Sequence, residues 1–552
     1  MPYMHQYDYI FAIAILFAAL DAFNIGANDV ANSFATSVSS RSLTLRQACL
    51  AAAVMEFLGA VLVGAKVAGT IKNGIISLSA FQSNAGVEML GFTCALVASA
   101  TWLMIATRNS WPVSTTYSIV SALAGVGVAI QGKDAVQWGW NGSKGIAAIF
   151  AGFIIAPGIS AGFAAVVYLI TKYAVLERKN SIRAGMMIAP VYFFTVAAVL
   201  TMSIIYKGAP SLKLDKLSQT TIALAIVLTG LVVAILSILF WLPYVHAKVV
   251  KKDYTIRWYH FFYGPLLWKR PAPTESLEHA HQHVPDYRVL GRDNEKKGFE
   301  EGTHPSTLPI DGQQRQEEGS PNRAKNLEIE GDLESQSSPT RPHKPVPLEE
   351  VEVDPKTQIE GLWLLPRNLW VILRYKIPKI LLHGSSVLFL QVLTACTNSF
   401  AHGSNDVANA VGPFAAVYYV WSHGEVTPKD TPTPTWILAF GGAMIVIGLA
   451  TYGYNIMAVL GNKLTMHSPS RGFSMEFGAA ITVLLASQYG IPVSTTMCIT
   501  GATMGVGLLS SGFKGVNWRS LGWIFLGWVL TVPVAGVAAG CLMGIILNAP
   551  HF

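Results

Sequence analysis

The chain contains several uninterrupted apolar stretches, and residues 219–245 form a plain example. About 18 or more such residues in helical form cross a hydrocarbon core about 30 Å thick. Backbone groups inside lipid must bond to one another, so these stretches are predicted to be helices. Only 13% of the residues are charged, whereas soluble proteins have about 25%. The apolar surface is therefore predicted to lie in a membrane.

We predict an all-α membrane protein with about 12 transmembrane helices. The predicted spans are residues 7–33, 47–66, 89–107, 111–131, 144–170, 185–206, 219–245, 384–405, 433–460, 472–489, 491–511 and 519–546. They define an N-terminal membrane part (1–250), a central loop (251–382) and a C-terminal membrane part (383–552). The loop is rich in Glu, Gln, Ser, Pro and His, so it is predicted to be largely disordered. Near its end, residues 363–376 suggest a short helix on the membrane surface.

Basic residues cluster in connections that share one side of the membrane if the spans alternate. The clusters follow spans one, five, seven and nine: Arg41 and Arg46; Lys172, Arg178, Lys179 and Arg183; Lys248, Lys251, Lys252 and Arg257; Lys463 and Arg471. Positive loops stay in the cytoplasm, so both termini are predicted outside and the long loop inside. The net charge of +7 reflects these signals and does not indicate nucleic-acid binding. Asn141 begins a possible glycosylation sequon on the outer side.

Two motifs occur twice in the same order. Residues 26–32 (GANDVAN) recur as 403–409 (GSNDVAN), and residues 112–116 (PVSTT) recur as 492–496. The predicted orientation makes the first copy enter the membrane from outside and the second from inside. Inverted repeats of this kind are typical of secondary transporters, which bind substrate near the midplane between the repeats. The alternative is a duplication retained only for packing, which would not require a carboxylate in each copy.

Asp29 and Asp406 lie at the ends of apolar spans, where a carboxylate costs about 2.5–3.5 kcal/mol at mid-bilayer. Neither has a Lys or Arg at helical spacing, so a bound cation is the expected neutralising group. The glycine before each Asn-Asp pair favours a broken or re-entrant helix, which would free carbonyl oxygens for sodium. The amides that share a helical face with these aspartates can serve a cation or an oxyanion: Asn28, Asn32, Asn405 and Asn409. The alternative role of each Asn-Asp pair is a helix cap.

The PVSTT segments are predicted to begin helices, with proline in the first turn and a hydroxyl as the cap. A helix N-terminus carries partial positive charge and free N–H groups, which bind phosphate. Opposed helix ends from the two copies would therefore form an anion site from Ser114, Thr115, Thr116, Ser494, Thr495 and Thr496. A plain capping cluster is the alternative.

Glu56 and Glu476 lie within apolar helices, each in a Met-Glu-Phe sequence, but at different distances from the repeated aspartates. They are candidate sodium ligands, proton carriers or buried hydrogen-bonded acids. An oxyanion beside two aspartates would be repelled unless cations also bind, and this provides a physical basis for coupled transport.

With these motifs the chain resembles the PiT inorganic phosphate transporters over about residues 8–260 and 380–550. Residues 33–46 and 455–473 resemble the fungal plasma-membrane branch, which is associated with sodium-coupled uptake. The resemblance implies phosphate on the Ser-Thr-Thr segments, with sodium near Asp29 and Asp406 and transport roles for Glu56 and Glu476. Family members often have His after the first Ser-Thr-Thr, where this chain has Tyr117, and that departure favours sodium over protons.

The sequence thus predicts a plasma-membrane symporter that carries inorganic phosphate inward with sodium ions. It is expected to be no enzyme, with no organic cofactor and no partners beyond phosphate, sodium and lipid, while a homodimer is left open. The alternatives are a proton-coupled transporter, a transporter of another tetrahedral oxyanion, and a phosphate sensor or receptor.

Overall fold

The computed structural model describes residues 3–271 and 387–549, apart from 41, 82, 141–144, 208–216, 252, 254, 430, 455, 458–463 and 466. Within these ranges the chain is almost entirely helical, with a single isolated β-bridge between Ile76 and Val136. The prediction of an all-α membrane protein is confirmed. Asn141 and the surface helix predicted at 363–376 lie outside the described residues.

The described part of the chain before residue 272 consists of α-helices, short π-helical and 3-10 segments, and the loops between them. The α-helices are α1 (Asp8–Ile25), α2 (Ala31–Ser39), α3 (Leu45–Val63), α4 (Ala65–Asn73), α5 (Ala85–Arg108), α6 (Thr115–Gln131), α7 (Ile146–Thr171), α8 (Ser181–Lys207), α9 (Gln219–Leu236) and α10 (Leu242–Val245). The other segments are η1 (His5–Tyr7), η2 (Gly26–Val30), η3 (Leu78–Phe81), η4 (Gly132–Ala135), η6 (Lys172–Leu176), η9 (Ser237–Trp241), η10 (His246–Val250) and η11 (Trp258–Lys269).

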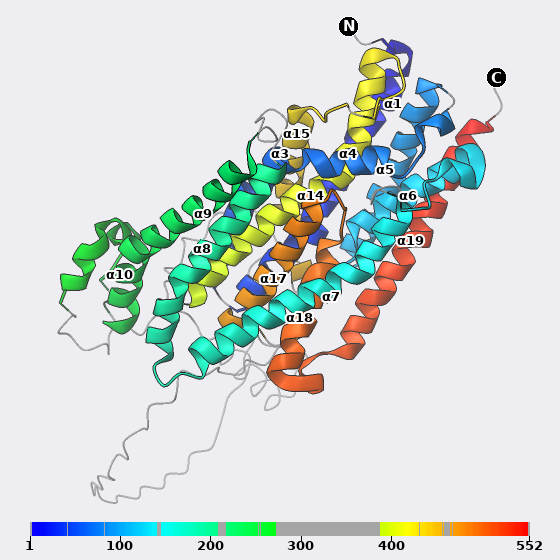
Figure 1. Ribbon diagram of the computed structural model, residues 1–552. Helices are drawn as coiled ribbons and strands as arrows, with labels where there is room; N and C mark the ends of the chain where they lie inside the picture. The colour runs from blue at the N-terminus through cyan, green and yellow to red at the C-terminus, as the bar shows by residue number, and fades with distance from the viewer. Residues whose placement is uncertain are drawn as a thin grey trace, which may run out of the picture.

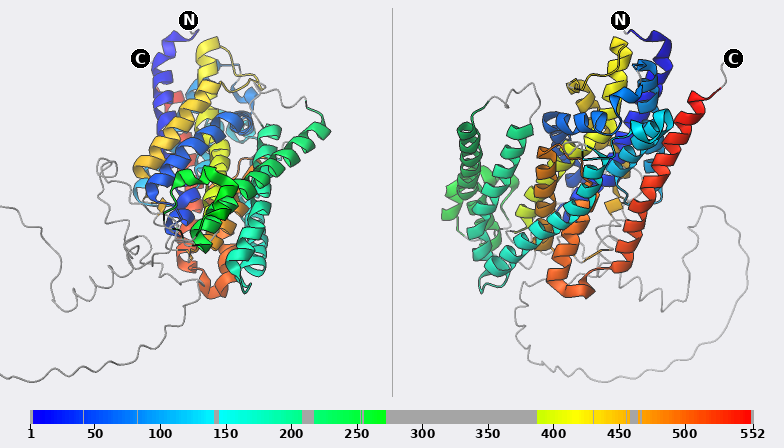
Figure 2. Two further views of the ribbon diagram at one scale, coloured as in Figure 1. Left: turned by 90° about the vertical axis from the view of Figure 1, so that its left-hand side faces the viewer. Right: turned by 45° about the vertical axis from the view of Figure 1, so that its right-hand side comes forward.

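The second repeat contains fewer and longer helices. They are α14 (Val387–His423), α15 (Thr435–Tyr452), α17 (Pro469–Gln488), α18 (Thr495–Ser511), the 3-10 segment η13 (Gly512–Gly515) and α19 (Trp518–Leu547). Figure 2 shows α8, α9 and η11 as a group at one side of the bundle. The 3-10 segment η11 falls within the loop predicted at 251–382 and packs against α10 and η9.

Nine helical stretches of the described chain are long and apolar enough to cross a membrane. Each of the nine corresponds to a predicted span. Three further predicted spans, at 384–405, 472–489 and 491–511, correspond to α14, α17 and α18, which are not among the nine. The predicted number of 12 is therefore not confirmed. The reason is visible in α17, whose side chains are buried along most of its length against α14, α7 and α18. A helix surrounded by protein does not need an apolar surface for lipid.

The two repeats run in opposite directions through the molecule (Figure 1). The α6–α7 connection lies near the end that holds both termini, and the α18–α19 connection lies at the opposite end. Both connections use the same turn. Gly132 after α6 has φ 72° and ψ −159°, and Gly512 after α18 has φ 65° and ψ −159°. A positive φ of this kind suits glycine, which has no Cβ. The inverted topology predicted from the motifs is thus built from matching local structure.

The repeats also exchange helices. α19 of the second repeat packs against α5 and α6, while α7 packs against α17 and α18. Similarly, α3 packs against α14, and α15 packs against α1 and η2. Small residues allow this close approach: a Cβ on Gly125 would meet the backbone of Gly536, and one on Gly501 would meet that of Pro157. The two halves of the sequence therefore form one interleaved body.

The glycines of the repeated motif permit close packing between the repeats. In the first copy the helix continues through the motif as the five-residue π-helix η2, and in the second copy α14 continues as an α-helix, so neither copy has the predicted break. A Cβ on Gly26 would collide with the carbonyl oxygen of Ile445 in α15. A Cβ on Gly403 would collide with that of Glu56 in α3. The predicted breaks are therefore wrong, and the two glycines instead allow the close contacts of η2 with α15 and of α14 with α3.

Candidate functional site

The two PVSTT segments form the N-termini of α6 and α18. Ser114 Oγ accepts a hydrogen bond from the Tyr117 amide at 3.2 Å, and Ser494 Oγ accepts one from the Met497 amide at 3.4 Å. The predicted helix starts and serine caps are confirmed. Each proline lies two residues before its cap, however, so the prediction that it occupies the first helical turn is wrong.

The two helix N-termini meet because an asparagine of each repeat reaches the threonines of the other. Asn32 Nδ2 donates to Thr496 Oγ1 at 2.8 Å. Asn409 Nδ2 lies 3.2 Å from both Thr115 Oγ1 and Thr116 Oγ1 and donates to these oxygens. All five side chains are almost completely buried. The structure thus joins residues more than 290 positions apart into one polar centre.

Both repeated aspartates belong to this centre. Asp29 accepts hydrogen bonds from the hydroxyls of Thr115 and Thr496, which come from different repeats. Asp406 accepts from Thr495 Oγ1 at 2.7 Å. Both carboxylates are at most 2% exposed. Their hydroxyl partners stabilise the charge only partly, because a hydroxyl is a weaker partner than a cation.

Asn28 and Asn405 hold the loops that precede the two helices. Asn28 Nδ2 donates to the Trp111 carbonyl at 3.0 Å, and its Oδ1 accepts from the Val113 amide at 3.1 Å. Asn405 Nδ2 donates to the Val493 carbonyl at 2.7 Å. Their amide groups are therefore engaged with protein, and they position the N-terminal ends of α6 and α18.

Several buried oxygens of the predicted cation ligands have no hydrogen-bond partner. They are Asn32 Oδ1, Asn409 Oδ1 and Glu56 Oε2. An unpartnered buried acceptor costs about 1–3 kcal/mol, and amide and carboxylate oxygens are suitable ligands for hard cations. Among the described residues no three His, Cys, Asp or Glu side chains form a metal cluster. The possible cation ligands at this centre are thus carboxylate, amide and hydroxyl oxygens.

Glu476 in α17 lies in a separate polar cluster. Its carboxylate accepts from Thr36 and, at 2.6 Å, from Ser37, both in α2. Thr394 in α14 donates to its other oxygen at 2.8 Å, and Gln391 Nε2 lies 3.5 Å away. The first-repeat partners follow Asn32 by about one helical turn, so this cluster adjoins the polar centre through α2.

Glu56 in α3 lies at a third position. It accepts one hydrogen bond, from Ser399 Oγ of α14 at 2.8 Å, and is completely buried. Its backbone packs against Gly403, three residues before Asp406. The structure therefore brings the aspartates, asparagines and threonines together but gives neither glutamate a direct hydrogen bond to them.

The sequence reasoning missed several polar partners, and His402 is the most informative. Its Nδ1 lies 3.2 Å from Asp406 Oδ2, without hydrogen-bond geometry, and the ring is 1% exposed. Its position one turn before Asp406 in α14 was a usable signal, because residues four apart share a helix face. Thr36, Ser37, Gln391, Thr394 and Ser399 gave no such signal, since they contact acids of distant segments.

A sequence profile described as "Phosphate transporter family" matches residues 25–539, which include both motif copies and the helices from η2 to most of α19. The chain belongs to the phosphate transporter family. It is 39% identical to the phosphate-repressible phosphate permease pho-4 of Neurospora crassa, over 100% of this chain and 99% of that protein. It is 29% identical to sodium-dependent phosphate transporter 1-B of Danio rerio, over 93% and 91% of the two chains.

A solved structure described as "The sodium-dependent phosphate transporter" has a similar fold. It matches with a TM-score of 0.65 and 26% identity, covering 98% of this chain and 100% of that one. Members of the phosphate transporter family move phosphate across membranes and are not enzymes. The polar centre between the repeats is accordingly the candidate transport site of a multi-pass membrane protein.

Proposed function

We propose that this chain is a symporter that carries inorganic phosphate into the cell across the plasma membrane together with sodium ions. The observation that supports the proposal is the meeting of two opposed helix N-termini with two buried aspartates in one hydrogen-bonded centre. In the proposed orientation both termini are outside, and the segment between the two membrane parts is cytoplasmic.

Phosphate would bind at the N-termini of α6 and α18. The free amides and partial positive charge there suit an oxyanion without Lys or Arg. The hydroxyls of Thr115, Thr116, Thr495 and Thr496 can add hydrogen bonds, with the capping serines holding the two turns. Asn28 and Asn405 would act indirectly, because they fix the preceding loops.

Sodium would bind beside the two aspartates, with oxygens from Asn32 and Asn409. Glu56 and Glu476 would complete further cation positions or relay charge along the pathway. Sodium-dependent relatives favour this ion, and a carboxylate with amide oxygens is a suitable hard-ligand set.

The threonine hydroxyls offer a concrete coupling mechanism. A hydroxyl has one hydrogen to donate, and Thr115 and Thr496 donate theirs to Asp29 in this structure. A sodium ion on the carboxylate would replace that donor and free both hydroxyls for phosphate. Binding of either ion then improves the site of the other, as reciprocal coupling requires.

The test is uptake of labelled phosphate by the purified protein in proteoliposomes, with sodium and proton gradients imposed separately. We expect uptake to follow the sodium gradient. If two sodium ions accompany a monoanion, an inside-negative potential should also accelerate uptake, since each charge gains about 2.3 kcal/mol per 100 mV. Uptake driven by a proton gradient alone would favour the proton-coupled alternative, and competition by sulfate would favour a broader oxyanion carrier.

A further inference from the structure

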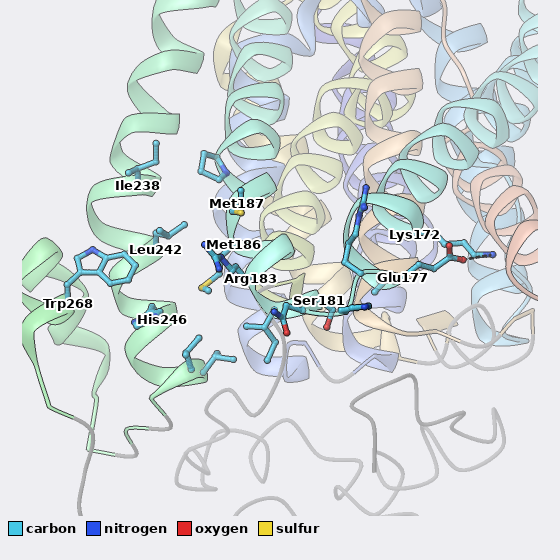
Figure 3. A pocket seen from close by; sticks show the side chains of 18 of the residues that line it. Lys172, Glu177, Ser181, Arg183, Met186, Met187, Ile238, Leu242, His246 and Trp268 are labelled. Atoms are coloured by element: carbon cyan, nitrogen blue, oxygen red, sulfur yellow. Dashed lines mark ion pairs between the residues drawn. The ribbon is translucent and has the colours of Figure 1, made fainter. Parts of the chain in front are cut away.

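A large cavity lies away from the transport site, between η6, the N-terminal part of α8, and the segment from η9 to η10 with η11 (Figure 3). Its volume is about 1130 Å³. Small-molecule sites usually measure about 300–1,000 Å³, so this cavity is large enough for an extended ligand. No residue of the two repeated motifs lines it.

One part of the cavity wall is strongly basic. Lys172, Arg178, Lys179 and Arg183 line it, whereas Glu177 is its one acidic residue. Glu177 lies 3.8 Å from Lys172 and offsets that charge. Arg178, Lys179 and Arg183 are exposed, and their side chains form no ion pair or hydrogen bond within the described chain. Three free cationic groups therefore surround the mouth of the cavity.

The first turn of α8 adds to this positive end. Ser181 begins a helix of 27 residues and also lines the cavity. The N-terminus of such a helix carries about half a positive charge and binds phosphate groups. The cation cluster and the helix end together favour a ligand with a phosphate group.

The rest of the wall is apolar. In Figure 3, Ile238 and Leu242 lie opposite Met186 and Met187, and Trp268 lies beside them. Ile238, Met187 and Trp268 are 48%, 71% and 41% exposed, as is typical of apolar residues that face lipid in a membrane protein. A water-soluble anion would gain nothing from contact with this apolar wall, whereas acyl chains would bury it favourably.

From this combination we propose that the cavity binds an anionic phospholipid, with its phosphate among Arg178, Lys179 and Arg183 and its acyl chains along the apolar wall between α8 and the η9–α10 segment. Basic pockets between transmembrane helices on the cytoplasmic side are suited to such headgroups. In the orientation proposed above, the rim lies on that side, where anionic lipids are concentrated.

The cavity is mechanically connected to the transport site through two helices. α7, which leads into the basic rim, packs against α18, where Ser160 Oγ donates to the Cys498 carbonyl at 2.7 Å. α8 contacts α17 through Tyr192 and Phe473, whose ring centroids are 4.7 Å apart. Phe473 precedes Glu476 by three residues. A bound lipid would therefore fix the helices that support α17 and α18, so it should modulate the transport rate.

The test measures lipid binding to the full-length protein by quenching of Trp268 fluorescence with phosphatidylserine that carries brominated acyl chains. The protein is placed in phosphatidylcholine membranes, and Trp268→Phe identifies the signal from the cavity. We expect saturable quenching that weakens at least about tenfold in Arg178→Gln/Lys179→Gln/Arg183→Gln. The control is Arg519→Gln, an exposed basic residue in the first turn of α19 that does not line the cavity.

Two further arms distinguish the source of the ligand. Glycerophosphoserine, which has the headgroup without acyl chains, and inorganic phosphate should displace the lipid poorly; full displacement would assign the cavity to a soluble anion. Deletion of residues 275–355 should leave quenching unchanged, whereas a large gain would show that this acidic segment of the chain itself occupies the site. Equal quenching in the triple variant and the parent protein would overturn the proposal.

A functional readout accompanies binding. Uptake by the parent protein should be faster in membranes that contain phosphatidylserine than in phosphatidylcholine alone, and the triple variant should lose this difference while retaining its phosphatidylcholine rate. A triple variant that is slowed equally in both membranes would show a structural role for the basic residues and would contradict the lipid site.

Discussion

The two copies of the repeated motif are nearly identical in sequence, yet their aspartates have different surroundings. Asp29 accepts hydrogen bonds from threonines of both repeats. Asp406 accepts from Thr495 of its own repeat and lies beside the imidazole of His402. The first copy has Ile25 at the position that corresponds to His402. An inverted repeat can thus provide two related cation sites that are not equivalent.

The most severe test removes the charge from each copy in turn. Asp29→Asn and Asp406→Asn should each reduce sodium-driven phosphate uptake at least about 100-fold, because a neutral amide cannot neutralise a bound cation. Labelled uptake, normalised to the protein present in the vesicles, measures the loss. The exposed Asp8→Asn is the control and should remain within about twofold. Normal uptake in either buried variant would contradict cation binding at that copy.

The next test concerns packing between the repeats. Gly26→Ala and Gly403→Ala place a Cβ against a backbone carbonyl of the other repeat. Each should destabilise the protein by about 1–3 kcal/mol, seen as a lower melting temperature in detergent. Gly69→Ala, where a Cβ meets nothing within 4 Å, should not lower it. If Gly403→Ala left the melting temperature unchanged while Gly26→Ala lowered it, the contact between α14 and α3 would be less tightly packed than the contact between η2 and α15.

The paired threonines separate phosphate binding from coupling. Thr116 donates to the Val493 carbonyl, whereas the equivalent Thr496 donates to Asp29. Thr116→Val should therefore weaken phosphate affinity about tenfold, with little effect on sodium affinity. Thr496→Val should change both affinities, because its hydroxyl serves the carboxylate. Uptake measured over sodium and phosphate concentrations gives both values, and identical behaviour of the two variants would exclude the hydroxyl coupling mechanism.

The smallest expected effect addresses the asymmetry itself. His402→Ile makes the second copy resemble the first and removes the imidazole that lies 3.2 Å from the Asp406 carboxylate. The sodium concentration for half-maximal uptake should rise about fivefold, equivalent to about 1 kcal/mol. An unchanged sodium dependence would mean that the two copies are functionally equivalent despite their different surroundings.

The parts of the fold that depend on local pattern were predictable. Long apolar stretches, the repeat and its inversion, and the serine caps of α6 and α18 follow from residues close in sequence. The partners of Glu476 were not predictable, because Thr36 and Ser37 are about 440 positions away. Nor could the exchange of α7 and α19 between the repeats be predicted, since nothing in a helix sequence specifies which distant helix it will contact.

The sequence predicted spans at α14 and α17, but these two helices are less apolar than the nine membrane-crossing stretches. Both contain site residues and are enclosed by other helices, so their composition reflects protein neighbours. The role of Gly403 could not be predicted either, because the backbone that leaves no room for a Cβ there is that of Glu56, in the other repeat. His402, by contrast, could have been found from its spacing to Asp406.

The polarity of α14 and α17 has a consequence for biogenesis. Insertion by the translocon favours segments that are individually apolar, and these two would partition poorly alone. They must enter the bilayer with the help of helices already inserted, such as α3 for α14 and α7 for α17. Synthesis of the first half thus prepares a template for the second, and damage to α3 or α7 should appear as misinsertion of helices made much later.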